Sequence, residues 1–485
     1  MINKTLYCFR ISLLALAVLA LAGLAFPETQ RLETLLAYLK SPNADTRKDA
    51  AHKLGERREH DQVAVEALAV AATKDEDEGV RAEAIRSLGL IKNFSALGEM
   101  LSGLKDPEPE VRRAAIKALV CLYTEHDIDF ITNMRRGWNL INPFLDTNDH
   151  EIIEPYVSVD PSIIGGLGDS ARSDHDRDNR VSAIRALGVL RGRDAIPQLA
   201  DSLNADQEVR MDVLRAFIKI GDPAAGQFVV PFFRDSDHNV RTEAMVAAGM
   251  LKYHPAVEPL MSVYGLGPER KGPVAKVTGK IQGRLQYLPP RDEAALWGLS
   301  LLGDPKSEQV FVENLDDKDG DRRQYAVEGL ARIGEHRYLD QISRAILTEH
   351  NNDVKLAQYW AMYKMGKRDS LQDVVRRVPT DQGQQARQYL SEVDSPADLY
   401  PYIHSSDREV SLETIKILGK IGDRDTIAEL KPVVEGSGRK SADAATVSIK
   451  QIEWRISGRP NATDTVLRRE QSGSEPPRPR KVSNQ

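Results

Sequence analysis

The chain has 485 residues, of which 28% are charged, 41% hydrophobic and only 6% aromatic. Its formal net charge is −6, and loss of Lys4 and Arg10 with the leader described below would lower it by two, to −8. This composition is typical of a folded, helix-rich protein, and the acidic balance argues against nucleic acid as a partner.

The first 25 residues are predicted to be a signal peptide. Lys4 and Arg10 form a basic start, Ile11 to Leu24 are apolar, and Gly23-Leu24-Ala25 supplies small residues for cleavage. The apolar run is shorter than the roughly 20 residues that a membrane-spanning helix needs. We therefore expect export to the periplasm or the extracellular space. The alternative is an N-terminal membrane anchor, and membrane contact is expected only through such an uncleaved leader.

Beyond the leader, one short phrase returns many times. It joins an acidic turn, a Val-Arg pair and an alanine-rich amphipathic helix, as in residues 75–88 (DEDEGVRAEAIRSL) and 106–119 (DPEPEVRRAAIKAL). The helix ends at a glycine turn, and a second apolar-periodic segment leads into the next acidic turn. Such a two-helix unit is too small to bury its own apolar face, so the units must stack.

These features resemble HEAT repeats, especially the short kind named after phycobilisome lyases. The resemblance covers roughly residues 31–456, in about eleven to twelve repeats. It implies an all-α protein, a right-handed α-solenoid of HEAT-like helical repeats. It does not identify a function, because the same solenoid serves many unrelated tasks.

Acidic and basic residues recur at fixed positions around the Val-Arg pair. When the repeats are aligned on the valine of the Val-Arg pair, this position forms a column. The valine column contains Val80, Val111, Val209, Val240, Val354 and Val410, with Thr46, Asn179, Arg291 and Arg322 as weaker members. Acidic residues stand five and three positions before the valine column, where they are placed to cap the next helix, and arginine stands one position after it. The resemblance to HEAT repeats implies a ladder in which the arginine of one repeat pairs with the aspartate of its neighbour. The expected ladder residues are Arg81, Arg112, Arg180, Arg210, Arg241, Asp75, Asp106, Asp174, Asp235 and Asp317. A calcium loop at residues 173–180 or 316–323 is the weaker alternative, because neither stretch has the full EF-hand spacing. No metal site is therefore expected.

The repeat pattern divides the chain into seven segments. The predicted order is a signal peptide (1–25), repeats (26–123), a degenerate repeat or insertion (124–178), repeats (179–264), a basic insertion (265–290), repeats (291–456) and a disordered tail rich in Pro, Ser and Arg (457–485).

The basic insertion is the predicted partner-binding site. Loops longer than about 15 residues in a compact array are usually functional or disordered. A variable, solvated loop is the alternative. The five cations are Arg270, Lys271, Lys276, Lys280 and Arg284.

No catalytic motif stands out. The chain has no HExxH, no Cys/His zinc pattern and no G-x-S-x-G, and His150-Glu151 alone matches the His-Glu pairs that di-iron HEAT enzymes of the deoxyhypusine hydroxylase type use in sets. The related lyases act on cytoplasmic chromophore proteins, which conflicts with an export leader. We therefore predict no enzyme and no cofactor, but an exported scaffold that binds a protein through its curved solenoid surface. A bilin-lyase-like or metal-dependent HEAT-repeat enzyme and an envelope glycan-binding protein remain alternatives.

Overall fold

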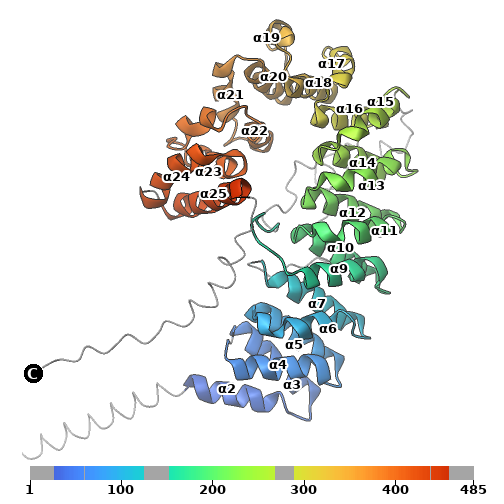
Figure 1. Cartoon of the computed structure of the whole chain (residues 1–485), viewed down its shortest axis with the longest axis vertical. Helices are drawn as coiled ribbons and strands as arrows, with labels where there is room; N and C mark the ends of the chain where they lie inside the picture. The colour runs from blue at the N-terminus through green and yellow to red at the C-terminus, as the bar shows by residue number, and fades with distance from the viewer. Residues whose placement is uncertain (1–26, 59, 125–151, 268–288, 437, 458–485) are drawn as a thin grey trace, which may run out of the picture. The chain divides into compact units, whose positions relative to one another are not determined.

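The computed structural model describes residues 27–58, 60–124, 152–267, 289–436 and 438–457. Every regular element in these ranges is helical, either α or 3-10, so the predicted all-α repeat fold is confirmed (Figure 1). The chain divides into two compact units. Unit 1 comprises residues 1–131 and 161–186, and unit 2 comprises residues 132–160 and 187–485.

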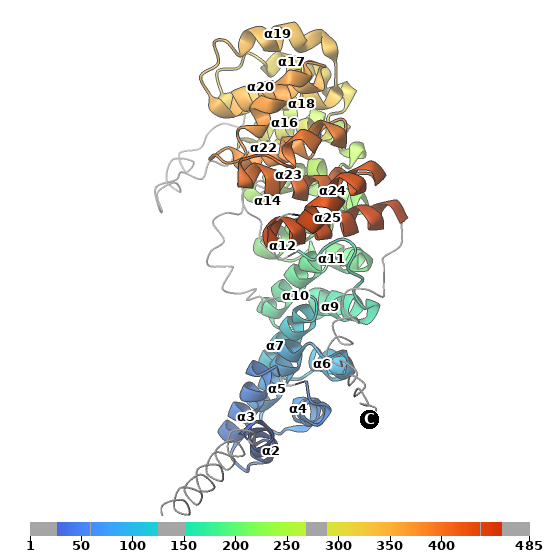
Figure 2. The same cartoon turned by 90° about the vertical axis from the view of Figure 1, so that its left-hand side faces the viewer.

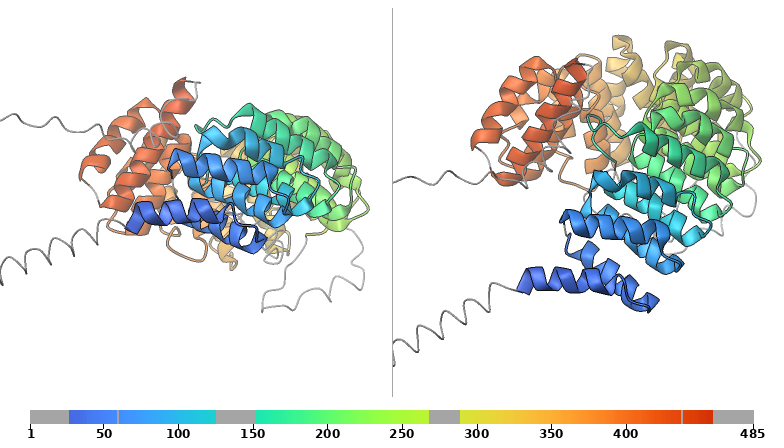
Figure 3. Two further views of the ribbon diagram at one scale, coloured as in Figure 1. Left: turned by 90° about the horizontal axis from the view of Figure 1, so that it is seen from below. Right: turned by 60° about the horizontal axis from the view of Figure 1, so that its bottom comes forward.

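Unit 1 contains the first repeats. Its helices are α2 (Pro27–Tyr38), α3 (Ala44–Glu56), α4 (Gln62–Lys74), α5 (Glu78–Ile91), η1 (Phe94–Ala96), α6 (Leu97–Gly103), α7 (Pro109–Cys121) and α9 (Pro161–Ser173), with α10 (Arg177–Val189) at the boundary. In each repeat the first helix precedes the acidic turn and the second helix follows it. The second helices α3, α5 and α7 form one layer, and the first helices α4 and α6 form the other (Figure 2). The blue to cyan helices of this unit lie one above another in Figure 3.

Unit 2 continues the same two-helix rule. Its α-helices are α11 (Ile196–Ser202), α12 (Gln207–Ile220), α13 (Gly226–Val229), α14 (His238–Met250), α15 (Val257–Tyr264), α16 (Arg291–Leu302), α17 (Glu308–Asn314), α18 (Gly320–Ile333), α19 (Leu339–Ala345), α20 (Asn352–Lys364), α21 (Leu371–Val375), α22 (Gly383–Leu390), α23 (Arg408–Ile421), α24 (Arg424–Gly436) and α25 (Arg439–Ser457). The 3-10 helices are η3 (Arg193–Ala195), η4 (Pro223–Ala225), η5 (Val230–Arg234), η6 (His254–Ala256), η8 (Pro305–Ser307), η9 (His336–Tyr338), η10 (Arg368–Ser370) and η11 (Pro396–Tyr402). Most first helices thus begin with a 3-10 turn.

The repeated phrase explains how several of the second helices start and end. In α5 the side chain of Asp77 accepts a hydrogen bond from the Val80 backbone N–H at 3.0 Å, which satisfies one of the free donors of the first turn. At the other end of the helix, a residue with positive φ closes the turn. This position is glycine in α12 (Gly221, φ 69°) and α18 (Gly334, φ 79°), but Lys92 (φ 58°) in α5.

The core lies between the helices of successive repeats. Helix α5 packs against both α3 and α7. The phrase that predicts α7 supplies its buried face, on which Val111, Ile116 and Leu119 are fully buried. Gly89 of α5 lies so close to α7 that a Cβ there would stand 2.6 Å from the Cα of Ala118. Small residues are therefore what allow the stacked helices to approach.

Candidate functional site

The acidic turns place arginine and aspartate side chains of neighbouring repeats against one another. Arg81 donates from Nε to Asp106 at 2.9 Å and also holds its own turn through the Asp75 carbonyl at 3.0 Å. The same arrangement joins Arg112 to Asp174 at 2.8 Å and Arg210 to Asp235 at 2.7 Å.

The surroundings favour the charged forms of both the aspartate and the arginine side chains of this ladder. Burial is the largest single influence on Asp75 and by itself would raise its pKa. The hydrogen bonds from Arg47 and from the Asp77 backbone N–H, together with the positive charges of Arg47 and Arg81, outweigh burial, and the pKa lies below the ordinary value. Its hydrogen bond to Asp106 raises the pKa of Arg81. Both partners therefore remain charged at neutral pH, which suits a contact that holds repeats together.

The remaining expected ladder residues form hydrogen bonds within their own turns. Arg180 and Arg241 each donate to a carbonyl of their own turn, those of Asp174 and Asp235, at 2.8 Å. Asp317 accepts the Asp319 backbone N–H at 2.8 Å. The arginine of that repeat, Arg323, pairs with Glu349, which stands where other repeats have aspartate.

A second row of contacts runs along the second helices, and the sequence analysis missed it. The residue six positions after the valine column contacts the residue three positions after the column in the next repeat. The pairs are His52 with Glu83 at 2.9 Å, Arg215 with Glu243 at 3.5 Å, and Trp297 stacked on Tyr325 with ring centroids 5.4 Å apart. We call these six residues the second-helix row. Fixed spacing from the column could have revealed it, but residue types change from ionic to aromatic along the row.

Unit 2 also holds a buried cluster of charged and aromatic side chains. The Arg332 guanidinium donates to Glu392 at 2.8 and 3.0 Å and to the Ser300 carbonyl at 2.9 Å. It also lies 5.0 Å above the ring of Trp360, which stacks on Tyr389. Apart from Tyr389 and Glu392, which are three positions apart, these residues are 28 to 92 positions apart in sequence, so no local pattern predicts the cluster.

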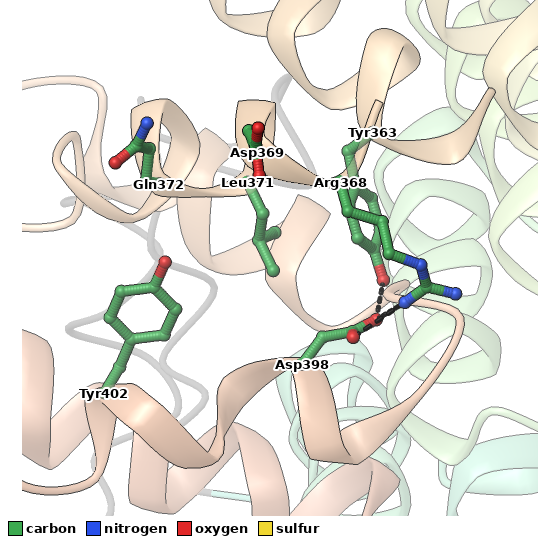
Figure 4. Close-up of a pocket in the computed structure, with 7 residues that line it drawn as sticks. All are labelled: Tyr363, Arg368, Asp369, Leu371, Gln372, Asp398 and Tyr402. Atoms are coloured by element: carbon green, nitrogen blue, oxygen red, sulfur yellow. Dashed lines mark hydrogen bonds and ion pairs between the residues drawn. The ribbon is translucent and has the colours of Figure 1, made fainter. Parts of the chain in front are cut away.

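One cavity of about 220 Å³ opens in unit 2 beside α20, η10, α21 and η11 (Figure 4). It is lined by Tyr363, Arg368, Asp369, Leu371, Gln372, Asp398 and Tyr402. At one end Tyr363 donates its hydroxyl to Asp398 at 2.6 Å, and burial, reinforced by this bond, raises the pKa of Tyr363. The other end is formed by Tyr402 and Gln372.

The predicted partner-binding cations of the basic insertion, at positions 270 to 284, lie outside the described residues. In the ranges that the structure describes, no group of three or more His, Cys, Asp or Glu side chains is placed to hold a metal ion. None of the described helices has the length and apolar character that crossing a membrane requires.

Comparison with known proteins identifies the repeat. The family model described as HEAT repeats matches residues 65–137 and 164–249. The phycocyanobilin lyase subunit alpha of Nostoc sp. (strain PCC 7120) is 26% identical over 235 residues, which are 47% of this chain and 76% of that protein. The corresponding subunit of Picosynechococcus sp. (strain PCC 7002) is 28% identical over 227 residues, 43% of this chain and 84% of that protein. A solved complex of CpcE and CpcF of phycocyanin lyase from Nostoc sp. PCC7120 aligns with 22% identity and a TM-score of 0.28, covering 56% of this chain and 86% of that one.

These relatives overturn one expectation. The absence of a catalytic motif led us to predict that the chain is no enzyme, and this prediction is wrong, because the similar proteins are named as lyase subunits. The similarity covers 235 residues of a chain that contains none of the motifs on which the prediction depended. The matched repeat model and the stacked helix pairs together show that this chain contains HEAT repeats.

Proposed function

We propose that this chain is one subunit of a lyase-type assembly, in which its HEAT solenoid holds a protein partner and a bilin-like chromophore is the group handled. The observation that carries the proposal is the similarity to two phycocyanobilin lyase α subunits over 76% and 84% of their own lengths. The printed name, subunit alpha, favours action together with a second chain. A stacked-repeat surface suits that role, since solenoids bind partners along extended faces.

The second-helix row is the surface that we assign to the partner. It brings side chains of successive repeats together at regular intervals, and part of it is open to solvent. The open part lies in unit 1, where the side chain of His52 is 44% exposed. Beside the row, Arg86 also binds Glu83 and is 28% exposed. Arginine is among the side-chain types that are enriched at protein interfaces.

The proposal is tested with the purified chain, phycocyanobilin and apo-phycocyanin. We expect the visible absorption of phycocyanobilin to change when the chain is added. Covalent attachment of phycocyanobilin to apo-phycocyanin should increase when the chain is present together with the second subunit that co-purifies with it. Attachment is read on a denaturing gel from the fluorescence of the bound bilin. An unchanged spectrum together with attachment no faster than without the chain contradicts the proposal.

A matched pair of variants tests the surface. His52→Ser combined with Arg86→Ser should weaken partner capture, whereas Lys74→Ser, an exposed cation in the first-helix layer, should leave capture unchanged. Circular dichroism checks that both variants keep their helices. Equal capture by both variants would assign the partner to another surface.

We also propose that the basic insertion attracts an acidic partner. The motivation is the concentration of five cations in one stretch of an otherwise acidic chain. Attraction of this kind weakens as salt screens it. Replacing all five cations by serine should therefore reduce capture mainly at low ionic strength, and unchanged capture would refute the role of the insertion.

A further inference from the structure

The cavity in unit 2 is built around one carboxylate. Asp398 accepts the Tyr363 hydroxyl at 2.6 Å, and Nη1 of Arg368 lies 2.7 and 2.6 Å from its two oxygens. Tyr363 is almost fully buried, so this end of the cavity is held by side chains that have little freedom to move. Arg368 by contrast is mostly exposed and closes the rim (Figure 4).

The charges of the lining do not cancel. Arg368 contributes +1, and Asp369 and Asp398 contribute −1 each, which leaves −1. The positive charge of Arg368 is already engaged by Asp398. Among the described residues the carboxylate of Asp369 makes no hydrogen bond or ion pair. A ligand that enters this cavity therefore meets a negative field, which favours a cation.

The opposite end offers unused hydrogen-bonding groups. Within the described part of the chain, the hydroxyl of Tyr402 and the side-chain amide of Gln372 have no partner, and Figure 4 shows both on the same side of the cavity. Burial raises the pKa of Tyr402, so the hydroxyl remains protonated. Between the two ends lies Leu371, which is buried and apolar. The lining thus suits a ligand with an apolar stem and a cationic head.

The volume of the cavity limits the kind of ligand that it can hold. Its 220 Å³ is far more than the ~10–15 Å³ that one water molecule requires. It is smaller than the roughly 300–1,000 Å³ of typical small-molecule sites. A single long side chain matches this intermediate volume.

We propose that this cavity receives one basic side chain, preferably arginine, of the protein partner. The inference rests on the proposed function in that it requires a protein partner. Arginine is favoured over lysine because its planar guanidinium stacks on an aromatic ring such as that of Tyr402 while donating in a fork to carboxylates.

The preceding repeat provides a matched control. There Glu308 accepts hydrogen bonds from Arg337 and from the Tyr338 hydroxyl, which is the same combination of groups as Asp398, Arg368 and Tyr363. These three residues lie outside the cavity lining. Glu308→Gln therefore removes a carboxylate of the same kind without altering the proposed site.

The test uses the full chain and N-acetyl-arginine amide, followed by saturation-transfer NMR. We expect saturable binding in the millimolar range, as for one side chain free of its partner, and binding of the neutral isostere N-acetyl-citrulline amide about tenfold weaker. Asp369→Asn should weaken arginine binding several-fold and Tyr402→Phe about threefold, while Glu308→Gln leaves it unchanged. These substitutions are at exposed or half-buried positions, so each variant is expected to fold.

Three results would overturn the inference: citrulline or N-acetyl-glutamate amide binding as well as arginine, no saturable binding of any probe, or equal affinity in Asp369→Asn and the unchanged protein. The titration involves neither chromophore nor partner. Its failure therefore leaves the lyase proposal standing, and failure of the chromophore assay leaves arginine binding to be judged by itself.

Discussion

Replacing Arg332 by methionine should destabilise unit 2 by about 3–5 kcal/mol, because the change leaves the buried carboxylate of Glu328 and the partly buried carboxylate of Glu392 without this cation. The Arg332 side chain is only 6% exposed, and it contacts both Glu328 and Glu392. It also donates to the Ser300 carbonyl of α16 and lies over Trp360 of α20. One side chain thus connects three successive second helices with the segment after α22.

The loss should depend on pH. In the native protein, burial raises the pKa of Glu392, but Arg332 lowers it more, and the net pKa lies below the ordinary value. A depressed pKa stabilises the fold above the unfolded pKa of about 4.3, and this contribution is lost as the pH falls through the folded pKa. Without Arg332 the effect of burial is opposed only by Lys252 and Gln388, so the pKa of Glu392 should rise. The stability that the charged carboxylate provides above this pKa is then reduced, and the deficit of the variant should be larger at pH 8 than at pH 5.

The assay is urea unfolding of the two proteins at these two pH values, followed by far-UV circular dichroism. Arg337→Met is the matched control, since Arg337 also pairs with a glutamate, Glu308, but its side chain is 59% exposed. An exposed pair of this kind contributes at most about 1 kcal/mol. The double variant Arg332→Met/Glu392→Gln should recover part of the loss and reduce its pH dependence. Equal losses for Arg332→Met and Arg337→Met, or a loss independent of pH, would refute the reasoning.

Four further predictions concern the repeats, metals and the leader. Leu119→Ala, at a fully buried position, should lower the free energy of unfolding by about 2–5 kcal/mol, and a loss below 1 kcal/mol in urea unfolding would contradict the packing. Gly89→Ala should cost about 1–3 kcal/mol, because its Cβ would overlap Ala118, and unchanged thermal stability would refute the close approach of α5 and α7. EDTA should leave the melting temperature unchanged, whereas a clear decrease would support calcium binding by the acidic turns. The intact mass of the exported protein should begin near Phe26, and Met1 retained in a membrane fraction would indicate an anchor instead.

The sequence alone predicted the repeat fold because each repeat carries its own instructions. An acidic cap, an apolar face at helical spacing and a glycine turn all lie within about 30 residues, so residues inside one repeat determine where its helices begin and end. The positions of Arg81 and Asp106 follow from the same spacing, and the structure places them 2.9 Å apart. The function was harder to predict from the sequence than the fold. The prediction that the chain is no enzyme relied on the absence of known motifs, and the similarity to proteins named as lyase subunits shows that this absence was not a sufficient basis.

Only the tertiary structure decided which side chains meet outside the ladder. Arg332 and Glu392 are 60 positions apart, and Tyr363 and Asp398 are 35 apart, so neither pair follows the spacing that relates ladder partners. Both depend on how α22 and η11 pack against the helices before them. The cavity likewise exists because Tyr402 of η11 stands across from Leu371 of α21, two residues that are 31 positions apart in the sequence (Figure 4). A local pattern specifies a helix and its neighbour, whereas contacts between more distant repeats depend on the accumulated packing of all the helices between them.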